Sequence, residues 1–467
     1  MGRAATALLL ALAAAVLAAL PAPARAATSA ATTTAPTAPP GVDTPVLGLR
    51  RIDDLDVAPD GYRLRGRAVL RAARAVPRIA RELRSHPGAA PSVFTKGPGL
   101  WQVSWFSAAR PPKEIAVVYL ADATGRVTEA WTGYQVAWTM ARGRPGAFGR
   151  KAAAWWLWVP LTLLFVLPFV DRRRPWRGPA VDLAAVALLG VSVAFFNHAR
   201  IDLSVPLVYP PLLYLLGRLL WIGLRRARDP AAALPLPLLV PVRWLGAGLV
   251  FLLAFRAGLN VLDSNVIDVG YAGVIGADRL AHGQALYGAF PADNLHGDTY
   301  GPIAYLVYVP AELVLPWSGR WDGLPAAHVV ALAADLACVG LLFAIGRRLR
   351  GARLGMALAY AWAACPFTLY ALASNANDAL VGVFVLGALL AAQRPGARGA
   401  LIGLAGWAKL APLALAPLFA AGADPPAGGR RARWAPGLRY VLGLGAVTAL
   451  AVALVLAHGD LRTFYDR

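Results

Sequence analysis

The chain has 467 residues, of which 58% are hydrophobic and 15% are charged, whereas about a quarter of the residues in a soluble domain are charged. Its 46 Lys and Arg residues outnumber 25 Asp and Glu residues, which gives a formal net charge of +21. A mean hydropathy of +0.53 excludes an ordinary cytosolic protein. The basic residues lie in short runs between long apolar stretches, which is typical of a membrane protein, so we expect no nucleic-acid partner.

The N-terminus has the pattern of a secretory signal peptide. Arg3 precedes an apolar run, and Ala24-Arg25-Ala26 has the A-x-A form of a cleavage site. We predict a signal peptide over residues 1–26, the alternative being an uncleaved anchor helix, and both place the following residues outside the cytoplasm. Residues 27–61 begin with a stretch rich in Ala, Thr and Pro, which predicts a linker.

Residues 62–150 are predicted to form a small α+β domain. Apolar residues at helical spacing from 62 to 85, with Arg on the other side and a kink at Pro77, predict a basic amphipathic helix. Three short alternating segments predict antiparallel strands at 100–107, 114–121 and 126–133. The DATGRV turn before the last strand resembles PepSY-type modules, which implies a regulatory or substrate-presenting role; a folded spacer is the alternative.

Eight apolar stretches that follow are predicted to cross a membrane. They lie at 153–170, 181–197, 207–224, 244–259, 326–345, 354–371, 379–392 and 440–457. The Arg runs that begin at residues 172, 225, 347 and 430 set their direction, because cytoplasmic loops retain Lys and Arg. Residues 151–235 would then contain three accessory helices.

Two further apolar stretches are predicted to enter the membrane only in part. Residues 300–317 are short and contain Pro302, and we interpret them as a re-entrant or interfacial helix. Residues 401–420 carry Lys409 and Pro412 at mid-depth, which favours a hairpin, because irregular backbone is tolerated where it lines a cavity. If either stretch crossed fully, the Arg run after it would lie outside.

Candidate functional groups gather on the predicted external side. The loop 260–299 contains five Asp residues, including Asp293, and one Arg. Asn377 and Asp378 begin a predicted span, and Lys409 lies within the hairpin. Ionisable groups in membrane segments are costly and are usually functional or paired, so these three groups are candidates for one site.

No cofactor is expected from the cysteines or histidines. The two cysteines lie inside apolar stretches, which excludes a disulfide framework, and no spacing of His and carboxylates suggests a zinc site. A divalent cation held loosely by one or two Asp residues is left open.

The second half of the chain resembles polytopic GT-C type glycosyltransferases that use polyprenyl-phosphate sugars, in particular the bacterial alpha-mannosyltransferase-like branch. The residues that carry the resemblance are Asp268 with Tyr271-Ala272, HGQALYG at 282–288, Tyr300-Gly301-Pro302, Asn377-Asp378 and GLAGWAKLAPLALAP at 403–417. The resemblance implies a GT-C-like catalytic domain over residues 236–467. Members of the family continue with further membrane helices, so we expect this domain to be incomplete at its C-terminus.

The resemblance and the chemistry together suggest a role for each candidate. Asp268, which matches the family's acidic position, is the expected general base, with Asp263 as the alternative. Lys409 or Arg279 would stabilise the negative charge of the leaving phosphate. The residues expected to orient the sugar or the acceptor are Tyr287, His296, Asp298, Tyr300, Asn377 and Asp378.

Each of these roles has a structural alternative. Asp263 and Asp268 would otherwise cap a helix, and Lys409 would otherwise extend its ammonium group to the membrane surface. His296 would otherwise be a solvated loop residue.

We therefore expect a mainly α fold, a polytopic transmembrane helical bundle with a small α+β extracytoplasmic N-terminal domain, in a bacterial cytoplasmic membrane. The expected function is transfer of a hexose, mannose by resemblance, from a polyprenyl-phosphate sugar to a cell-envelope glycolipid or glycan on the outer face. A transporter or lipid flippase is one alternative, although no repeat between the two halves supports it. A non-catalytic envelope sensor is the other alternative.

Overall fold

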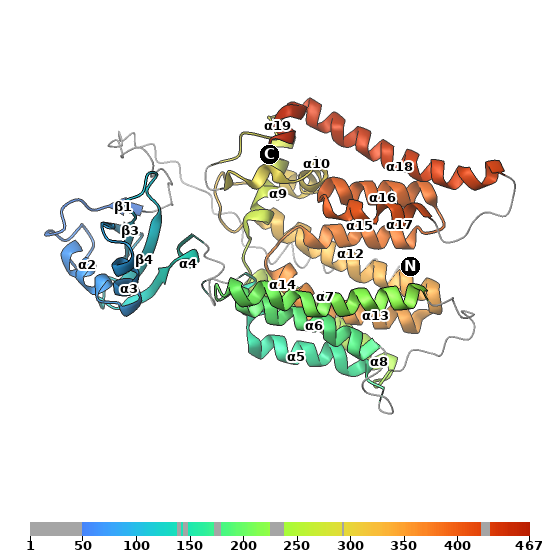
Figure 1. Cartoon of the computed structure of the whole chain (residues 1–467), viewed down its shortest axis with the longest axis horizontal. Helices are drawn as coiled ribbons and strands as arrows, with labels where there is room; N and C mark the ends of the chain where they lie inside the picture. The colour runs from blue at the N-terminus through green and yellow to red at the C-terminus, as the bar shows by residue number, and fades with distance from the viewer. Residues whose placement is uncertain are drawn as a thin grey trace. The chain divides into compact units, whose positions relative to one another are not determined.

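A computed structural model describes residues 49–137, 142, 148–171, 179–224, 238–291, 294–421 and 430–467, and in the last range it describes side chains from residue 435 onward. The predicted signal peptide, most of the predicted linker, the Arg runs 172–177 and 225–228, and Asp293 lie outside the described residues. The described chain divides into two compact units, 49–137 with 196–201 and 148–195 with 202–467. Figure 1 shows the elements of each.

The smaller unit is an antiparallel sheet packed against two helices (Figure 1). Its strands follow one another in chain order across the sheet: β1 Leu49–Arg51, β2 Ala90–Lys96, β3 Leu100–Phe106, β4 Glu114–Ala121 and β5 Val127–Thr132. The helices are α2 Gly66–Arg74 and α3 Pro77–Ser85, and a short helix α4 Tyr134–Ala137 follows the sheet. The three predicted strands are present as β3, β4 and β5, whereas β1 and β2 were not expected.

The predicted helix at 62–85 is two helices rather than one kinked helix. A proline disfavours helical backbone at the residue before it, and it has no backbone N–H to donate. Val76 is accordingly extended, with φ −64° and ψ 122°, and Pro77 opens α3. Val69 on α2 and Ile79 on α3 are fully buried and share one apolar core with Trp101 of β3.

The described residues of the larger unit form helices and connecting loops. Five helices are long and apolar enough to cross a membrane: α6 Pro179–Phe196, α7 Ile201–Leu224, α8 Val242–Leu262, α12 Pro325–Arg350 and the Ala435–Ala457 part of α18 Arg430–Ala457. The pair α13 Ala352–Ala364 and α14 Pro366–Ala373, bent by 56°, would make a sixth. These apolar helices identify a multi-pass membrane protein.

The predicted number of eight crossings is not confirmed. The segment predicted at 153–170 forms α5 Trp155–Val166, of 12 residues, and the 3-10 turn η3 Leu167–Phe169. The segment predicted at 379–392 forms α15 Asp378–Leu390, which has 13 residues. A helix of that length extends about 20 Å, less than the roughly 30 Å of a hydrocarbon core. Neither helix is therefore long enough by itself to cross the hydrocarbon core.

The partial segments are broken helices. Residues 300–317 contain α10 Pro302–Leu306 and α11 Val309–Val314, and neither is among the candidate spans. The stretch 401–420 contains the end of α16 Pro395–Ala408, then η7 Ala411–Leu415 and α17 Ala416–Ala421. Lys409 lies at the break with extended backbone. Their re-entrant path through a bilayer stays a prediction.

Helices distant in the sequence pack in a continuous series that brings the candidate residues together. α8 packs on α13, α13 on α12, α12 on α15, α15 on α16 and α16 on α18. A further helix, α9 Asp268–Ala281, contacts α10, α11 and α12. The starts of α9 and α15 and the end of α16 each carry a predicted site residue.

Candidate active site

Four of the predicted site residues lie close together in the larger unit, and we call them the polar cluster: Asp268, Tyr300, Asp378 and Lys409. The Lys409 ammonium forms an ion pair with Asp378 Oδ1 and lies 5.5 Å from the centre of the Tyr300 ring. Burial, followed by the negative charges of Asp268 and Asp378, raises the pKa of Tyr300 to about 12. Tyr300 therefore keeps its proton at neutral pH and can donate a hydrogen bond.

Two glycines allow the backbone segments of the cluster to approach. A Cβ on Gly270, in the first turn of α9, would lie 2.3 Å from the carbonyl oxygen of Asn375. A Cβ on Gly301, beside Tyr300, would lie 1.9 Å from the carbonyl oxygen of Trp407. Real Cβ atoms do not occupy such positions, so a side chain at either glycine would separate these segments.

Hydrogen bonds tie the segment before α9 to the segment before α15. The Asn265 N–H donates to Ala373 O at 3.1 Å, and the Ile267 N–H donates to Ser374 O at 3.2 Å. The Asn375 side-chain amide donates to Asn265 O at 3.0 Å. Asn375 has a left-handed φ of 50°, which asparagine tolerates better than most residues. These hydrogen bonds therefore hold the first residues of α9 and α15 close to each other.

Asp268 presents an exposed carboxylate to the cluster. Its Oδ1 accepts the N–H of Val269 at 3.0 Å, and its carbonyl oxygen accepts Asn294 Nδ2 at 3.0 Å. Among the described residues the Asp268 carboxylate has no ion pair, whereas the Asp378 carboxylate is occupied by Lys409. Of the two, Asp268 is the carboxylate without a cationic partner among the described residues.

Tyr287 and Asp298 support the backbone around Tyr300. The Tyr287 hydroxyl donates to Tyr300 O at 3.1 Å. Asp298 is 1% exposed, and its Oδ2 accepts the Gly288 N–H at 2.7 Å and lies 3.4 Å from Arg467 Nε. The geometry gives these two residues a positioning role for the loop that leads into α10.

Arg279 lies at the far end of α9 from Asp268. Eleven residues separate the two, about 16 Å along a helix. The Arg279 guanidinium donates to Ala285 O at 2.9 Å and to Ala289 O. It therefore holds the loop after α9, and of the two predicted cations the structure brings only Lys409 to the cluster.

Of the remaining predicted residues, Asp263 and His296 have no described contact with the ion pair, whereas Asn377 directly precedes Asp378. Asp263 ends α8 and its Oδ2 is 3.4 Å from Lys151 Nζ. His296 is exposed before the turn η6 Gly297–Thr299. Asn377 is 3% exposed, caps α15, and its Oδ1 has no hydrogen-bond partner among the described residues. Asn377 is next to Asp378 in sequence, so it borders the cluster.

Aromatic side chains that the sequence analysis did not select border α9 one turn after Asp268. Tyr271 stacks on Trp321 with ring centres 4.9 Å apart and meets Trp317 edge-on at 5.8 Å. The Trp321 indole N–H donates to Val266 O at 3.0 Å, and 39% of Trp321 is exposed. Nothing in the spacing of these aromatic residues indicates this stacking.

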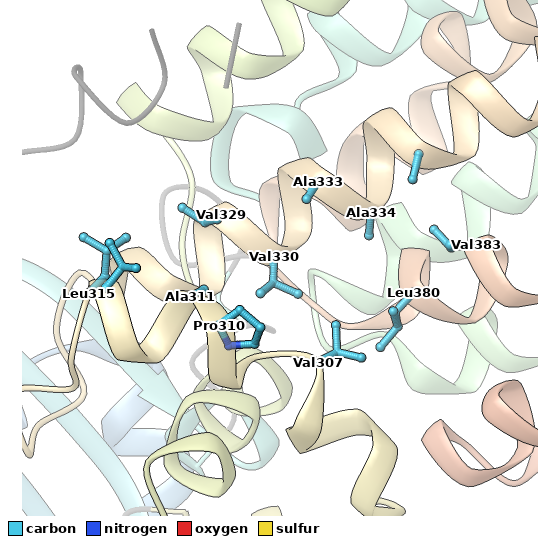
Figure 2. A pocket seen from close by; sticks show the side chains of 12 residues that line it. Val307, Pro310, Ala311, Leu315, Val329, Val330, Ala333, Ala334, Leu380 and Val383 are labelled. Atoms are coloured by element: carbon cyan, nitrogen blue, oxygen red, sulfur yellow. The ribbon is translucent and has the colours of Figure 1, made fainter. Parts of the chain in front are cut away.

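An apolar groove of about 450 Å³ is lined by side chains around α11, α12 and the start of α15 (Figure 2). Its lining comes from α10 and α11 with their flanks, the first half of α12 and the start of α15: Val307, Pro310, Ala311, Val314, Leu315, Val329, Val330, Ala333, Ala334, Ala337, Leu380 and Val383. Leu380 follows Asp378 by two residues and packs in one apolar cluster with Ala408, against which Tyr300 also lies. The groove and the ion pair therefore share the first turns of α15.

In the part of the chain that the structure describes, no group of three or more His, Cys, Asp or Glu side chains is arranged to hold a metal ion. The expectation that the protein needs no cofactor stays a prediction.

The model of Glycosyltransferase family 87 matches residues 299–466. No curated protein and no solved structure matches the chain. The matched segment includes Tyr300, Asp378 and Lys409 and begins after Asp268. Together with the apolar helices, this match supports a membrane glycosyltransferase, which is the general class expected from the sequence.

Proposed function

We propose that the protein is a GT-C type enzyme that transfers a hexose, with mannose as the first candidate, from a polyprenyl-phosphate sugar to a cell-envelope glycolipid or glycan on the extracytoplasmic face of a bacterial cytoplasmic membrane. The observation that carries the proposal is that the polar cluster and the apolar groove share the start of α15. A polyprenyl-phosphate sugar likewise combines a charged, polar head with a long apolar chain.

The proposed reaction exchanges one C1–O bond of the sugar for another and transfers one proton. The acceptor hydroxyl oxygen attacks C1 of the sugar, its proton passes to the Asp268 carboxylate, and the bond from C1 to the phosphate oxygen breaks. Polyprenyl phosphate leaves with an additional negative charge, which Lys409 stabilises across the cluster. Asp378 holds the Lys409 ammonium, and the Tyr300 hydroxyl donates to the phosphate or to a sugar oxygen.

The lining of the groove supports a lipid-linked donor over a nucleotide sugar. All twelve lining side chains are apolar, and burying apolar surface stabilises a complex by about 25 cal/mol per Å². A nucleotide offers charged phosphates and polar base edges that this lining cannot satisfy, whereas an isoprenoid chain buries only apolar groups.

Substitution of the proposed base tests the function. Purified protein in liposomes that contain a polyprenyl-phosphate hexose and envelope glycolipid acceptors is expected to transfer the sugar. Asp268→Asn removes the proton acceptor at nearly constant volume, and we expect its kcat to fall by about 10²- to 10⁴-fold. Donor affinity is expected to change little, because Lys409 and the groove are retained.

Asp278→Asn is the matched control, because Asp278 lies on the same helix and contacts His282 instead of the cluster. It should retain transfer. Full transfer by Asp268→Asn would contradict the assigned base. Movement of the lipid-linked sugar across the liposome membrane, without transfer by the unsubstituted protein, would contradict the proposed function and favour a flippase.

A further inference from the structure

The two helices of the smaller unit present a face of arginines that the fold does not use. Val69, Ala73 and Ile79 on the inner side of α2 and α3 are fully buried. The arginines at 67, 71, 74, 78, 81 and 84 are exposed. The apolar residues thus account for the packing of both helices, and the arginines require another explanation.

Four of these arginines form what we call the Arg face: Arg71, Arg74, Arg81 and Arg84. Arg67 differs from them because it pairs with Asp56, and the Arg78 guanidinium lies over the Trp131 ring. Among the described residues, none of the four forms an ion pair or a side-chain hydrogen bond. Glu82 is the only acidic residue on α2 and α3, and it contacts His86. The Arg face therefore carries uncompensated positive charge.

A hollow at the end of the Arg face is suited to an anionic group. It has a volume of about 320 Å³ and is lined by Arg74, Ala80, Leu83, Arg84, His86, Gly88 and Ala89. Two guanidinium groups give it a cationic rim, the His86 imidazole adds a hydrogen-bonding group, and Leu83 and Ala89 give it apolar walls. Arginine binds phosphate through paired N–H donors, which a phosphate at this rim would satisfy.

The chain itself limits which anionic surface lies within reach. The smaller unit ends its described run at Ala137, and the first apolar helix of the larger unit begins at Trp155. The 17 residues between them extend at most about 60 Å. The smaller unit is therefore tethered within about 60 Å of the apolar helices, whereas a soluble polyanion would have to be captured from solution.

We propose that the Arg face and its hollow bind the phosphate headgroups of anionic phospholipids and so hold the smaller unit at the bilayer surface. Electrostatic attraction of the four arginines supplies most of the binding, and the hollow between Arg74 and Arg84 takes one headgroup. This inference does not depend on the proposed glycosyl transfer.

Fluorescence quenching in nanodiscs tests this with the full chain. A fluorophore is attached at Ser85→Cys, which is exposed beside Arg84, or at Ala123→Cys, which is exposed in the β4–β5 turn; both native cysteines are buried. A lipid with a nitroxide on its headgroup should quench the label at 85 more than the label at 123 when the disc contains phosphatidylglycerol. With phosphatidylcholine alone, or in 1 M salt, that difference should disappear, because salt reduces the screening length to about 3 Å.

Two double substitutions with the same change in charge distinguish binding by the Arg face from an effect of the net charge of the smaller unit. Arg74→Glu with Arg84→Glu should lower the ratio of bound to free smaller unit by at least about 25-fold, because each basic residue near an anionic surface contributes about fivefold and each new Glu is repelled by that surface. Lys113→Glu with Arg126→Glu, both exposed in turns of the sheet, should leave quenching unchanged. Equal losses in both variants, equal quenching in phosphatidylcholine, or an equal response of the label to a soluble acidic polysaccharide would overturn the proposal.

Discussion

Gly301 is the residue at which the geometry of the polar cluster is most sensitive to a single methyl group. In Gly301→Ala, the new Cβ would lie 1.9 Å from Trp407 O, so the start of α10 and the end of α16 must move apart. That movement withdraws Tyr300 from Lys409. We expect transfer activity to fall about 10²-fold, the scale reported for a misplacement near 1 Å.

Gly323→Ala provides the control for this substitution. A Cβ on Gly323 meets no atom within 4 Å, so the variant should keep its activity. Both variants are to be compared by transfer rate and by thermal stability in detergent. A fully active Gly301→Ala would show that the contact between α10 and α16 is not needed for the reaction.

Asp122 in the smaller unit gives a prediction about pH. Burial opposes its ionisation, but hydrogen bonds from Trp101 Nε1 at 2.8 Å and from the N–H groups of Leu64 and Arg63 outweigh burial and lower its pKa. A lowered pKa stabilises the fold at pH values above the unfolded value, about 3.9, and this contribution is lost as the pH falls through the folded value.

Asp122→Ala should therefore destabilise the smaller unit at pH 7 and much less at acidic pH. It leaves three donors without their acceptor, of which the Trp101 indole N–H is buried and costs about 1–3 kcal/mol when unsatisfied. Limited proteolysis of residues 49–137 within the full chain, across a range of pH, measures this. A loss of protection that is the same at all pH values would show that the charge of Asp122 contributes nothing.

Part of the candidate site could be selected from the sequence, because ionisable residues beside apolar segments are expensive. This reasoning identified Asp378 and Lys409, which the structure pairs. It could not distinguish Asp268 from Asp263, because the partner of Asp263 is Lys151, which lies far away in the sequence. It also could not see that the Arg279 guanidinium is used by nearby carbonyl groups. Spacing places a residue in a loop but does not give the direction of its side chain.

Among the secondary-structure elements, prolines mark where the sequence-based expectations failed. Pro77 was expected to kink one helix and Pro366 lies within an expected single span, yet each begins a new helix after an extended residue. Strand β2 was missed because Pro91 and polar residues hide its alternation. Strand β1 has three residues and is recognisable only through its pairing with β2. Strands β3 and β4 were predictable because they consist mostly of apolar residues, and most of their residues are buried.

A buried ion pair joins α8 to α12 and gives a prediction at the level of helix packing. Arg256 is 1% and Asp335 is 3% exposed; Arg256 Nε is 3.0 Å from Asp335 Oδ2, and the indole N–H of Trp362 on α13 donates to Asp335 at 2.8 Å. Arg256→Leu leaves a buried carboxylate without its counter-ion. We expect the free energy of unfolding to fall by about 3–5 kcal/mol.

The double variant Arg256→Leu with Asp335→Leu is the informative comparison. It removes both charges, so its stability should lie near that of the unsubstituted protein or above it. Denaturation in detergent micelles, followed by helical circular dichroism, distinguishes the two. If the double variant were as unstable as Arg256→Leu, the hydrogen bonds to Trp362 and to the Ala363 carbonyl, rather than the ion pair, would be the stabilising interaction.

At the level of the whole molecule, the proposed donor has two binding regions. The polar cluster would bind its sugar phosphate, and the apolar groove would bind its lipid chain. The cluster lies at the starts of α9 and α15, and the groove continues along α12 and α15. The matched family segment, 299–466, includes all the groove residues and all of the cluster except Asp268. A lipid-linked donor would therefore lie mainly along the matched segment, with Asp268 approaching its sugar from α9.

Filling the groove tests this division. Ala333 lines the groove and is exposed on α12, so Ala333→Trp should occupy its space without disturbing the buried core. If the indole excludes two methylenes of the donor chain, at about 0.8 kcal/mol each, KM for a long-chain donor should rise roughly tenfold. A donor with a chain too short to reach the groove should be used equally well by both proteins. Ala449→Trp, on the exposed side of α18, adds the same side chain elsewhere and should change neither value; a similar loss with short and long donors in Ala333→Trp would place the chain outside the groove.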